Sequence, residues 1–446
     1  MKVQPRTLKG FRDFLPAAMI PRERLMETAR QVYRSYGFSP IDTPTLEYLE
    51  ILLGKGSDET DRQLYRFEDN GGRQVGMRFD LTVPLARFAA QHIQQLGTPF
   101  KRYHIAPVWR GENTHRGRYR EFVQCDFDTI GTTSIVADIE TVLVIHDLMH
   151  AIGVDNFTIR INNRKVLNGL LNRLGLHDQS TAILRAMDKL PKVGAQKVAE
   201  ELTTAAGTND LQNQDILTLA TLHGDHEQIL VGLKSTVQDD ETGVAGLEAL
   251  SQVVHGATAA GVAADKLQID PSIARGLDYY TGTIVETFLN DLPDIGSVCS
   301  GGRYDNLAEV YTNQELPGIG ASLGLDRLLA ALTELSLIET VSTPAPVLVT
   351  YFDRDQRDTY LRIAATVRAA GIGVELYPDP KKLGVQLKYA SQRGFRIALI
   401  AGEDELSAGK CQVKDLANRE SYDASLEGMG ADSLLETIRR ILRSEP

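Results

Sequence analysis

The sequence predicts an α+β fold in which a mainly antiparallel sheet is flanked by helices, interrupted by a helical insertion and followed by a separate α/β domain. Two strand-like runs within 103–130 lie on either side of a loop that contains Gly and Asn, which is the pattern of an antiparallel hairpin. From about 165 to 260 the composition changes to Ala, Leu, Gln, Asp and Thr with helical periodicity. Beyond 347, short apolar runs alternate with helical segments, as in an α/β domain.

These patterns divide the chain into segments with expected boundaries. A chain of 446 residues is long enough for two or three domains, each with its own apolar core. We expect a first domain over 1–335, interrupted by the insertion at 165–260, then a Pro-containing linker over 336–346. A C-terminal domain over 347–446 follows.

The overall composition is typical of soluble globular proteins. Apolar residues make up 42% and charged residues 24%. No run approaches the roughly 18 apolar residues of a membrane helix, and the first twenty residues lack a signal-peptide core. Cys125, Cys299 and Cys411 are far apart without a CxxC, so we expect free thiols in the cytoplasm. The net charge of −11 restricts any nucleic-acid contact to a local surface.

The N-terminal part predicts a helix followed by extended chain. Pro21 favours a helix start and Gly37 a stop. Between them the apolar positions recur at helical spacing, at Leu25, Ala29, Val32, Tyr33 and Tyr36. We therefore expect about four helical turns, then extended chain broken by Pro40 and Pro44. The Gly-rich and charged stretch over 52–73 predicts a loop and a hairpin.

The hairpin within 103–130 carries a dense group of charged side chains in its loop, namely Arg110, Glu112, Arg116, Arg118, Arg120 and Glu121. Arginine binds phosphate in bidentate fashion and keeps its charge, so four guanidinium groups on one hairpin can form an anion receptor. A solvated charged hairpin is the alternative. A helix from about 134 to 152 is expected next.

Two further clusters follow the insertion. The run ARGLDYYTG places Arg275 and Asp278 beside Tyr279 and Tyr280; an arginine among apolar residues requires an anion, which is either a ligand or Asp278. The runs SGGRYDNL and PGIGASLGLDRL contain glycines that permit close approach, with Arg327 in the first turn of a helix. No GxxxxGK[ST] is present, and no GxGxxG follows a first strand, which argues against a P-loop or dinucleotide fold.

The C-terminal domain contains a basic stretch, PKKLGVQLKYASQRGFR, which has no acidic residue. Its cations are Lys381, Lys382, Lys388, Arg393 and Arg396. A basic face confined to one domain of an acidic chain is typical of a nucleic-acid contact. Cations near a helix C-terminus also complement the helix dipole, which is the alternative explanation.

In this order, the motifs resemble those of histidyl-tRNA synthetases, from LKGFRDFLP to the C-terminal domain. The helix with FSPIDTPTLE resembles class II motif 1, VWRGENTHRGRYREFVQCDFD resembles motif 2, and PGIGASLGLDRLLAAL resembles motif 3. RGLDYYTG and SGGRYDNL are similar to two signatures peculiar to the histidyl enzymes. The resemblance implies a class II catalytic domain, an anticodon-binding C-terminal domain and a homodimer.

The resemblance also implies roles for individual residues. It implies that Arg110, Arg118 and Arg327 bind ATP, with Arg110 and Arg275 as catalytic residues and Mg²⁺ as an additional cation. The residues that match histidine-binding positions are Asp80, Thr82, Gln124, Asp128, Arg275, Tyr279, Tyr280 and Tyr304. Asp80 and Asp128 are shorter acids than those of many bacterial members. No metal ligand is assigned to a protein side chain.

Contacts to tRNA(His) are implied for two regions, with His115 and Arg116 in the hairpin loop and Lys381, Lys382 and Lys388 in the C-terminal domain. The loop sequence NTHRG departs from the Arg-Pro-Gln type common in bacterial members. Two other functions carry the same motifs. A regulatory paralogue of ATP phosphoribosyltransferase usually lacks the C-terminal domain and the extra arginine, and a stress-sensing kinase would need a kinase domain.

Overall fold

The computed structural model describes residues 2–53, 62–273, 279–338, 341–426 and 430–444, without the side chains of 191 and 430–432. The chain divides into two compact units. The first comprises Arg24–Ile338 together with the N-terminal segment that ends at Asp13, and the second comprises Glu339–Pro446 together with Phe14–Glu23. Each unit is described by itself.

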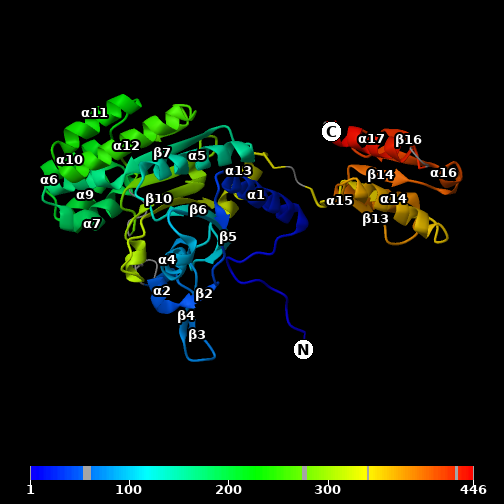
Figure 1. Ribbon diagram of the computed structural model, residues 1–446, viewed down its shortest axis with the longest axis horizontal. Helices are drawn as coiled ribbons and strands as arrows, with labels where there is room; N and C mark the ends of the chain where they lie inside the picture. The colour runs from blue at the N-terminus through cyan, green and yellow to red at the C-terminus, as the bar shows by residue number, and fades with distance from the viewer. Residues whose placement is uncertain (1, 54–61, 274–278, 339–340, 427–429, 445–446) are drawn as a thin grey trace. The chain divides into compact units, whose positions relative to one another are not determined.

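The first unit is built on an eight-stranded sheet with the order β1-β5-β6-β11-β10-β9-β7-β8 (Figure 1). Neighbouring strands from β5 to β7 are antiparallel, and only the outer pairs β1–β5 and β7–β8 are parallel. The antiparallel sheet predicted from the sequence is thus confirmed. The strands are β1 Ser39–Pro40, β5 Phe100–Trp109, β6 Glu121–Ile130, β7 Phe157–Asn163, β8 Leu267–Ile269, β9 Thr283–Leu289, β10 Cys299–Tyr304 and β11 Gly318–Gly324.

The order of the strands brings distant motifs together at the centre of this sheet. β6 precedes the insertion and β11 follows it, yet the two strands pair directly, from Gln124 opposite Gly324 to Ile130 opposite Gly318. β10, which carries the first residues of SGGRYDNL, lies next to β11. Side chains from three separated parts of the sequence therefore share one face of the sheet.

Helices flank the sheet, and one boundary differs from the prediction. α1 spans Pro16–Ser35, so it begins one turn before Pro21, which lies inside the helix. Pro16 supplies the fixed φ suited to a first helical position, whereas Pro21 only removes one backbone hydrogen bond. The expected helix near 134–152 is confirmed as α5, Ile135–Ile152, capped by Ser134. The other helical segments are α2 Leu49–Leu53, α4 Thr82–Leu96, η2 Pro293–Ile295, η3 Leu307–Val310 and α13 Leu325–Glu334.

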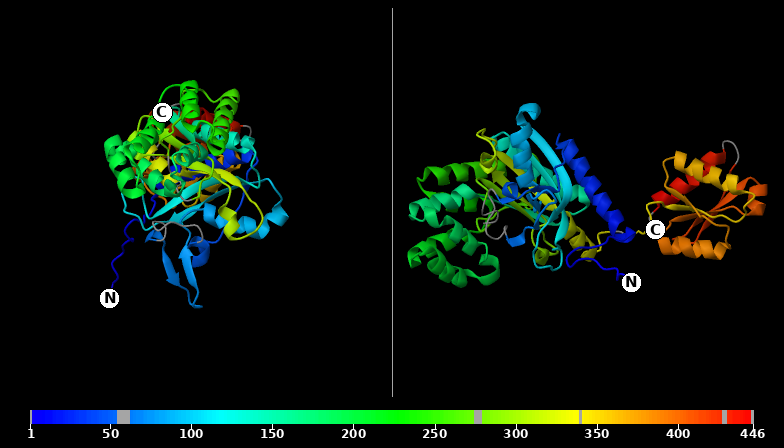
Figure 2. Two further views of the ribbon diagram at one scale, coloured as in Figure 1. Left: turned by 90° about the vertical axis from the view of Figure 1, so that its left-hand side faces the viewer. Right: turned by 90° about the horizontal axis from the view of Figure 1, so that it is seen from below.

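The segment predicted as a helical insertion is helical and packs beside the sheet (Figure 2). Its helices are α6 Arg164–Arg173, η1 His177–Gln179, α7 Ser180–Met187, α8 Leu190–Val193, α9 Ala195–Ala206, α10 Asp210–Ala220, α11 His226–Val237 and α12 Glu241–Ala259. A Cβ on Gly169 of α6 would lie 2.4 Å from the Cα of Gly243 of α12, so these helices cross in direct backbone contact. Buried residues of the insertion and of the sheet form one continuous apolar cluster. The insertion belongs to the first compact unit.

A small antiparallel sheet accompanies the large one and confirms the hairpin expected near residue 73. It has the order β2-β4-β3, with β2 Leu46–Tyr48, β3 Arg66–Glu68 and β4 Gln74–Met77.

The second unit contains a five-stranded mixed sheet with the order β13-β12-β14-β15-β16. β13, β12 and β14 are parallel, while β15 and β16 are antiparallel additions, which confirms the α/β prediction. Its elements are β12 Val347–Val349, α14 Arg357–Ala369, β13 Val374–Leu376, α15 Leu383–Arg393, β14 Ile397–Ile400, α16 Glu403–Ser407, β15 Lys410–Asp415, β16 Ser421–Ser425 and α17 Gly430–Arg443. Among the described residues, no helix combines the length and apolar character needed to cross a bilayer.

Candidate active site

Two adjoining cavities lie over the central strands of the first unit and share Arg110, Gln124, Ser300 and Ser322. We call the first the acidic cavity; its lining includes Asp80, Thr82, Gln124, Asp126, Asp128, Tyr279, Tyr280 and Tyr304. We call the second the arginine cavity; its lining includes Arg110, Glu112, Arg118, Tyr119, Asp326 and Arg327. The two cavities therefore differ in charge and meet at Arg110.

The floor of the acidic cavity comes from one face of β6. Gln124, Asp126 and Asp128 alternate along the strand and so point to the same side. Gln124 Nε2 donates to Ser322 Oγ of β11 at 2.7 Å. Opposite Asp128 stands Gly320, where a Cβ would lie 2.2 Å from Asp128 Oδ1. Glycine at 320 thus leaves the room that the carboxylate of Asp128 occupies.

A buried arginine balances the charge of this floor. Arg102 of β5 is fully buried, and its Nη2 lies 2.6 Å from Asp128 Oδ2 and 3.9 Å from Asp126 Oδ2. Burial raises the pKa of Asp126 to about 7, an effect that Arg102 opposes and Asp128 reinforces. Burial likewise raises the pKa of Asp128, and the positive charge of Arg102 again lowers it.

Asp80 forms another part of the wall, at the start of α4. Its Oδ1 accepts a hydrogen bond from the Val83 amide at 3.0 Å, so the carboxylate is fixed by the first turn of the helix. Burial raises the pKa of Asp80, whereas that amide and Arg110 lower it. Thr82 is the first residue of the same helix.

Three tyrosines close the acidic cavity. The rings of Tyr279 and Tyr280 meet edge to face with centroids 4.7 Å apart, and those of Tyr279 and Tyr304 are 6.3 Å apart. Tyr304 donates its hydroxyl proton to Asp128 Oδ1. Burial raises the pKa of all three phenols, so each keeps its proton at neutral pH and can donate a hydrogen bond.

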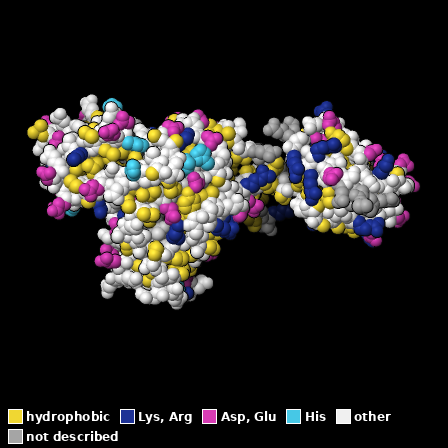
Figure 3. Space-filling view, turned by 45° about the horizontal axis from the view of Figure 1, so that its top comes forward, with side chains coloured by type: hydrophobic (Ala, Val, Ile, Leu, Met, Phe, Trp, Pro, Cys, Tyr) yellow, Lys and Arg dark blue, Asp and Glu magenta, His cyan; other side chains and the backbone are white. Residues whose placement is uncertain are grey.

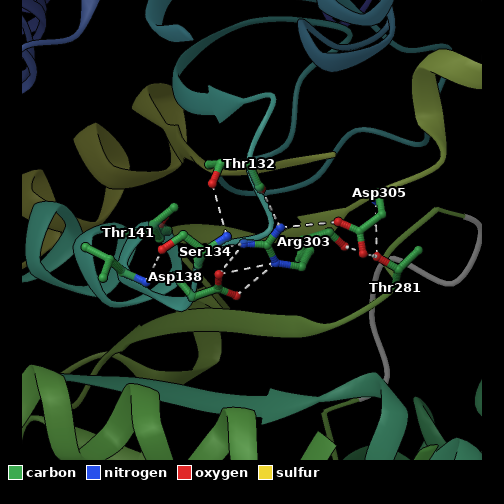
Figure 4. Close-up of polar contacts among 9 residues, drawn as sticks. Thr132, Ser134, Asp138, Thr141, Thr281, Arg303 and Asp305 are labelled. Atoms are coloured by element: carbon green, nitrogen blue, oxygen red, sulfur yellow. Dashed lines mark hydrogen bonds and ion pairs between the residues drawn. The ribbon is translucent and has the colours of Figure 1, made fainter. Parts of the chain in front are cut away.

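Arg303 connects the segments that carry Tyr280 and Tyr304 (Figure 4). It forms a buried ion pair with Asp138 of α5 and donates to the Thr132 carbonyl at 3.0 Å. Its Nη1 lies 3.2 Å from Asp305 Oδ1, and Asp305 Oδ2 accepts a hydrogen bond from Thr281 at 2.7 Å. Arg303 precedes Tyr304 and Thr281 follows Tyr280 in the chain, so this network fixes both tyrosines.

The arginine cavity brings together cations from two segments, the hairpin loop between β5 and β6 and the start of α13. Arg110, which follows β5, donates from Nε to the Phe79 carbonyl at 2.9 Å. Arg118 in the hairpin loop donates to Glu112 at 2.9 Å, while Arg327 of α13 donates to the Ser297 carbonyl at 2.5 Å. The three side chains predicted to bind phosphate therefore line one cavity.

The N-terminal segment supports this cavity through residues that the sequence interpretation missed. Arg12 donates to Asp326 Oδ1 at 2.6 Å, and Asp326 Oδ2 accepts from the Val123 amide at 2.8 Å. The Arg12 guanidinium also stacks 3.1 Å above the ring of Tyr119. These contacts fix the start of α13, next to Arg327.

Arg102 and Asp126 were missed as well, although each left a signal. Arg102 is a charged residue within a strand-like run of the hairpin, and Asp126 shares the two-residue period of Gln124 and Asp128. By contrast, the partnership of Arg12 with Asp326 spans 314 positions and leaves no local pattern.

The remaining predicted residues lie elsewhere or outside the described part of the chain. Arg275 and Asp278 fall outside the described residues. His115 forms backbone hydrogen bonds with Arg118, and the exposed Arg116 pairs with Glu334. The exposed cations predicted to contact tRNA in the second unit are Lys381, Lys382 and Lys388. Within the described ranges, no group of three His, Cys, Asp or Glu residues could hold a metal ion.

Comparisons with known proteins agree over both units. The family model for histidyl-tRNA synthetase matches residues 10–328, and the model for an anticodon binding domain matches 346–440. The histidine–tRNA ligase of Rhodopirellula baltica is 65% identical over 437 residues, covering 98% of this chain and 99% of that protein. The ligase of Wolinella succinogenes is 44% identical over 429 residues, covering 93% and 94%.

A solved structure gives the same result. The crystal structure of histidyl-tRNA synthetase from Nostoc sp. PCC 7120 has a TM-score of 0.89 at 36% identity, covering 98% of this chain and 100% of that one. With both domain models and both full-length relatives, this places the chain in the histidyl-tRNA synthetase family of class II aminoacyl-tRNA synthetases.

Proposed function

We infer that the chain is a histidine–tRNA ligase, which activates L-histidine with ATP and transfers it to the 3′ end of tRNA(His). The observation that carries this function is the junction at Arg110, where a buried acidic cavity opens onto a cavity lined by arginines. An amino acid in the first cavity and a triphosphate in the second would meet at this guanidinium.

The arginine cavity suits the first half-reaction. The histidine carboxylate attacks the α-phosphorus of ATP, a phosphorus–oxygen bond breaks, and pyrophosphate leaves. Negative charge accumulates on the reacting phosphorus centre and on pyrophosphate, so fixed cations stabilise the transition state more than the ground state. We place Arg110 on the α-phosphate, with Arg118 and Arg327 on the remainder of the triphosphate.

Two further components act at the same centre. We propose that Arg275 offsets the repulsion between the substrate carboxylate and the α-phosphate. Glu112 lines the arginine cavity, and one carboxylate together with phosphate oxygens is a donor set that Mg²⁺ accepts. When bound, Mg²⁺ would neutralise part of the triphosphate charge.

The acidic cavity suits an amino acid with a ring that forms two hydrogen bonds. Asp80, Thr82 and Gln124 are placed to receive the α-ammonium group. Asp128 and Tyr280 would bind the imidazole, with Tyr279 and Tyr304 completing the wall. Because these polar groups are buried, a side chain without matching donors and acceptors would leave them unpaired, which costs binding energy.

The second unit is proposed to contact tRNA(His) through its exposed lysines, and Figure 3 shows Lys and Arg side chains on one face of it. Lys382 is the N-cap of α15 and Lys381 precedes it, so the helix dipole opposes rather than favours both charges. Dipole complementation therefore does not explain them, whereas an anionic partner does. His115 and Arg116 are proposed to contact the acceptor end of the tRNA. We also propose that the chain forms a homodimer in the cytoplasm.

Pyrophosphate exchange measured with each of the twenty amino acids tests the activation step. Histidine alone should support exchange. Exchange with a different amino acid, or with none, would contradict the function. The variant Arg275→His should keep measurable histidine binding but slow single-turnover activation by about 100-fold or more; near-normal activation would remove its assigned role.

The tRNA contact needs a separate measurement. The double variant Lys381→Glu/Lys382→Glu should keep histidine-dependent exchange and lower the rate of tRNA charging at low tRNA concentration by about tenfold. The double variant Arg354→Glu/Lys410→Glu, which reverses two other exposed cations of the same unit, is the matched control. Equal charging by both double variants would show that the lysines before α15 are not a contact.

A regulatory histidine-binding role is one alternative function. It requires a histidine pocket but no receptor for a triphosphate. The arginine cavity and the match of residues 346–440 to an anticodon binding domain both support the ligase instead.

A further inference from the structure

Asp126 is a buried acid of the acidic cavity with no role assigned so far. Its residue is 2% exposed and lines the cavity between Gln124 and Asp128. Its Oδ1 is buried and accepts no hydrogen bond from the described residues. A buried carboxylate oxygen without a donor is costly, and such atoms in a binding cavity are commonly satisfied by the ligand.

The charge around Asp126 is incompletely balanced within the chain. Arg102 Nη2 lies 2.6 Å from Asp128 Oδ2 but 3.9 Å from Asp126 Oδ2, so the guanidinium pairs closely with Asp128 alone. Ser322, opposite Asp126 on β11, is a hydrogen-bond partner that favours the ionised form of Asp126. One guanidinium cannot neutralise two buried carboxylates, so a second proton donor is needed near Asp126.

We propose that Asp126 is a specificity-determining residue that hydrogen-bonds one ring nitrogen of the substrate imidazole, so that the ring meets two carboxyl groups, Asp126 and Asp128. This inference rests on the proposed function. The side chains of Asp126 and Asp128 lie on the same face of β6, two positions apart, which places their carbons roughly 6–7 Å from each other along the strand. A five-membered ring between them could direct one nitrogen toward Asp126 and the other toward the side of the cavity that carries Asp128 and Tyr280.

The chemistry of imidazole suits a pair of acids of this kind. Neutral imidazole has one donor and one acceptor nitrogen, and its pKa is about 6.5. Burial raises the pKa of Asp126 to about 7, so ring and carboxyl group bind a proton with similar strength. Whether the proton is on the imidazole or on the carboxyl group of Asp126, one group donates and the other accepts, so the hydrogen bond between them is kept.

A purely structural role is the competing account, in which Asp126 only contributes to the electrostatic surroundings of Arg102. The two accounts differ in one measurable respect. If Asp126 has only a structural role, its replacement should change stability and the KM values of both substrates. If Asp126 binds the ring, its replacement should change the KM of histidine and the choice among ring analogues, and leave the KM of ATP unchanged.

The test is pyrophosphate exchange by the full chain, with the KM of histidine and of ATP measured separately. Asp126→Asn should raise the KM of histidine about 10–100-fold, the effect of one mismatched buried hydrogen bond, while the KM of ATP stays within about threefold. Cys125→Ala is the matched control, because Cys125 neighbours Asp126 on β6 and is buried in the apolar cluster on the other face. This control should leave both KM values unchanged.

Ring analogues supply the sharper measurement. Wild-type chain should discriminate against both 1-methylhistidine and 3-methylhistidine, since each lacks one ring N–H position. Asp126→Ala removes one carboxyl group, so it should relieve discrimination against one isomer and keep it against the other. Equal discrimination against both isomers by this variant would overturn the proposal.

The outcomes separate this inference from the function on which it rests. If wild-type chain gave no histidine-dependent exchange, the proposed function would fail. If wild-type exchange were present and Asp126→Asn kept the wild-type KM for histidine, only the role of Asp126 would fail. An unchanged KM of ATP shows that a variant is folded, and Asp126→Ser replaces Asp126→Asn if the latter is unstable.

Discussion

The acidic cavity and the arginine cavity adjoin each other but are constructed differently. The acids of the first are short side chains, with Asp126 and Asp128 on β6 and Asp80 at the start of α4, and all three are buried. The cations of the second are long side chains at element ends and in a loop. The side chain of Arg110 is 32% exposed and that of Arg118 is 42% exposed.

The difference indicates that the acidic cavity determines amino-acid specificity, whereas the arginine cavity supplies positive charge for the triphosphate. Strand register fixes the position of a short side chain, so the acidic cavity can reject a ligand that differs by one hydrogen bond. Phosphate groups are large, highly charged and similar in all nucleoside triphosphates. Long arginine side chains can keep their contacts with the phosphate groups as these move during the reaction, but they are held less rigidly than the acids of the strands. The next four predictions test this division.

The largest effect is expected where the cavities meet. Arg110→Ala removes the cation that both share, so histidine-dependent pyrophosphate exchange should lose about 100–1000-fold in kcat. The KM values of both substrates should change by much less, because the charge that Arg110 stabilises is largest in the transition state. A comparable loss confined to the KM of ATP would show that Arg110 only binds nucleotide.

Gly320→Ala should damage the acidic cavity alone. The added Cβ would meet Asp128 Oδ1 and the Phe127 carbonyl, each at 2.2 Å, so the carboxylate and the backbone of β6 must both shift. We expect the KM of histidine to rise about 10-fold or more and the unfolding free energy to fall by about 1–3 kcal/mol. Gly384→Ala, which meets nothing within 4 Å, is the control. A parallel rise in the KM of ATP would break the proposed division.

Arg118→Ala should weaken only the arginine cavity, and modestly. Its guanidinium is partly exposed and already pairs with Glu112, so its net contribution to ATP binding is reduced by solvent and by that pair. The KM of ATP should rise by about 3–10-fold, consistent with one charged hydrogen bond, with the KM of histidine unchanged. Arg116→Ala, which removes a more exposed arginine of the same loop, paired with Glu334, should leave exchange unaltered.

The smallest effect is a pH dependence of stability that belongs to the acidic cavity. Burial raises the pKa of Asp126 to about 7, so between about pH 4 and 7 the folded chain retains a proton that the unfolded chain has released. Raising the pH through this window therefore destabilises the folded wild-type chain. Thermal unfolding midpoints of wild type should fall by a few degrees relative to Asp126→Asn between pH 5 and pH 8. If the unfolding midpoints of wild type and Asp126→Asn changed with pH in parallel, the raised pKa of Asp126 would be contradicted.

The sequence predicted the fold better than it predicted the acidic cavity. The alternation of apolar and polar residues on both sides of the loop at 111–119 was enough to predict the hairpin of β5 and β6. Both this alternation and the turn residues are features of neighbouring residues in the sequence. The start of α1 was misplaced because two prolines compete for the first turn, and Pro21 is tolerated inside the helix. Family motifs supplied most site residues but not Asp126, because its burial beside Asp128 and Arg102 depends on contacts between neighbouring strands.

The pairing of β6 with β11 has a consequence for synthesis on the ribosome. About 190 residues separate Ile130 from its partner Gly318, so at about 5–20 residues per second the nascent chain waits roughly 10–40 s between the two. During this interval β6, with its apolar Phe122, Val123 and Phe127, presents an open backbone edge of the kind that recruits unwanted strands. A newly made chain is therefore most in need of a chaperone before the last central strand emerges.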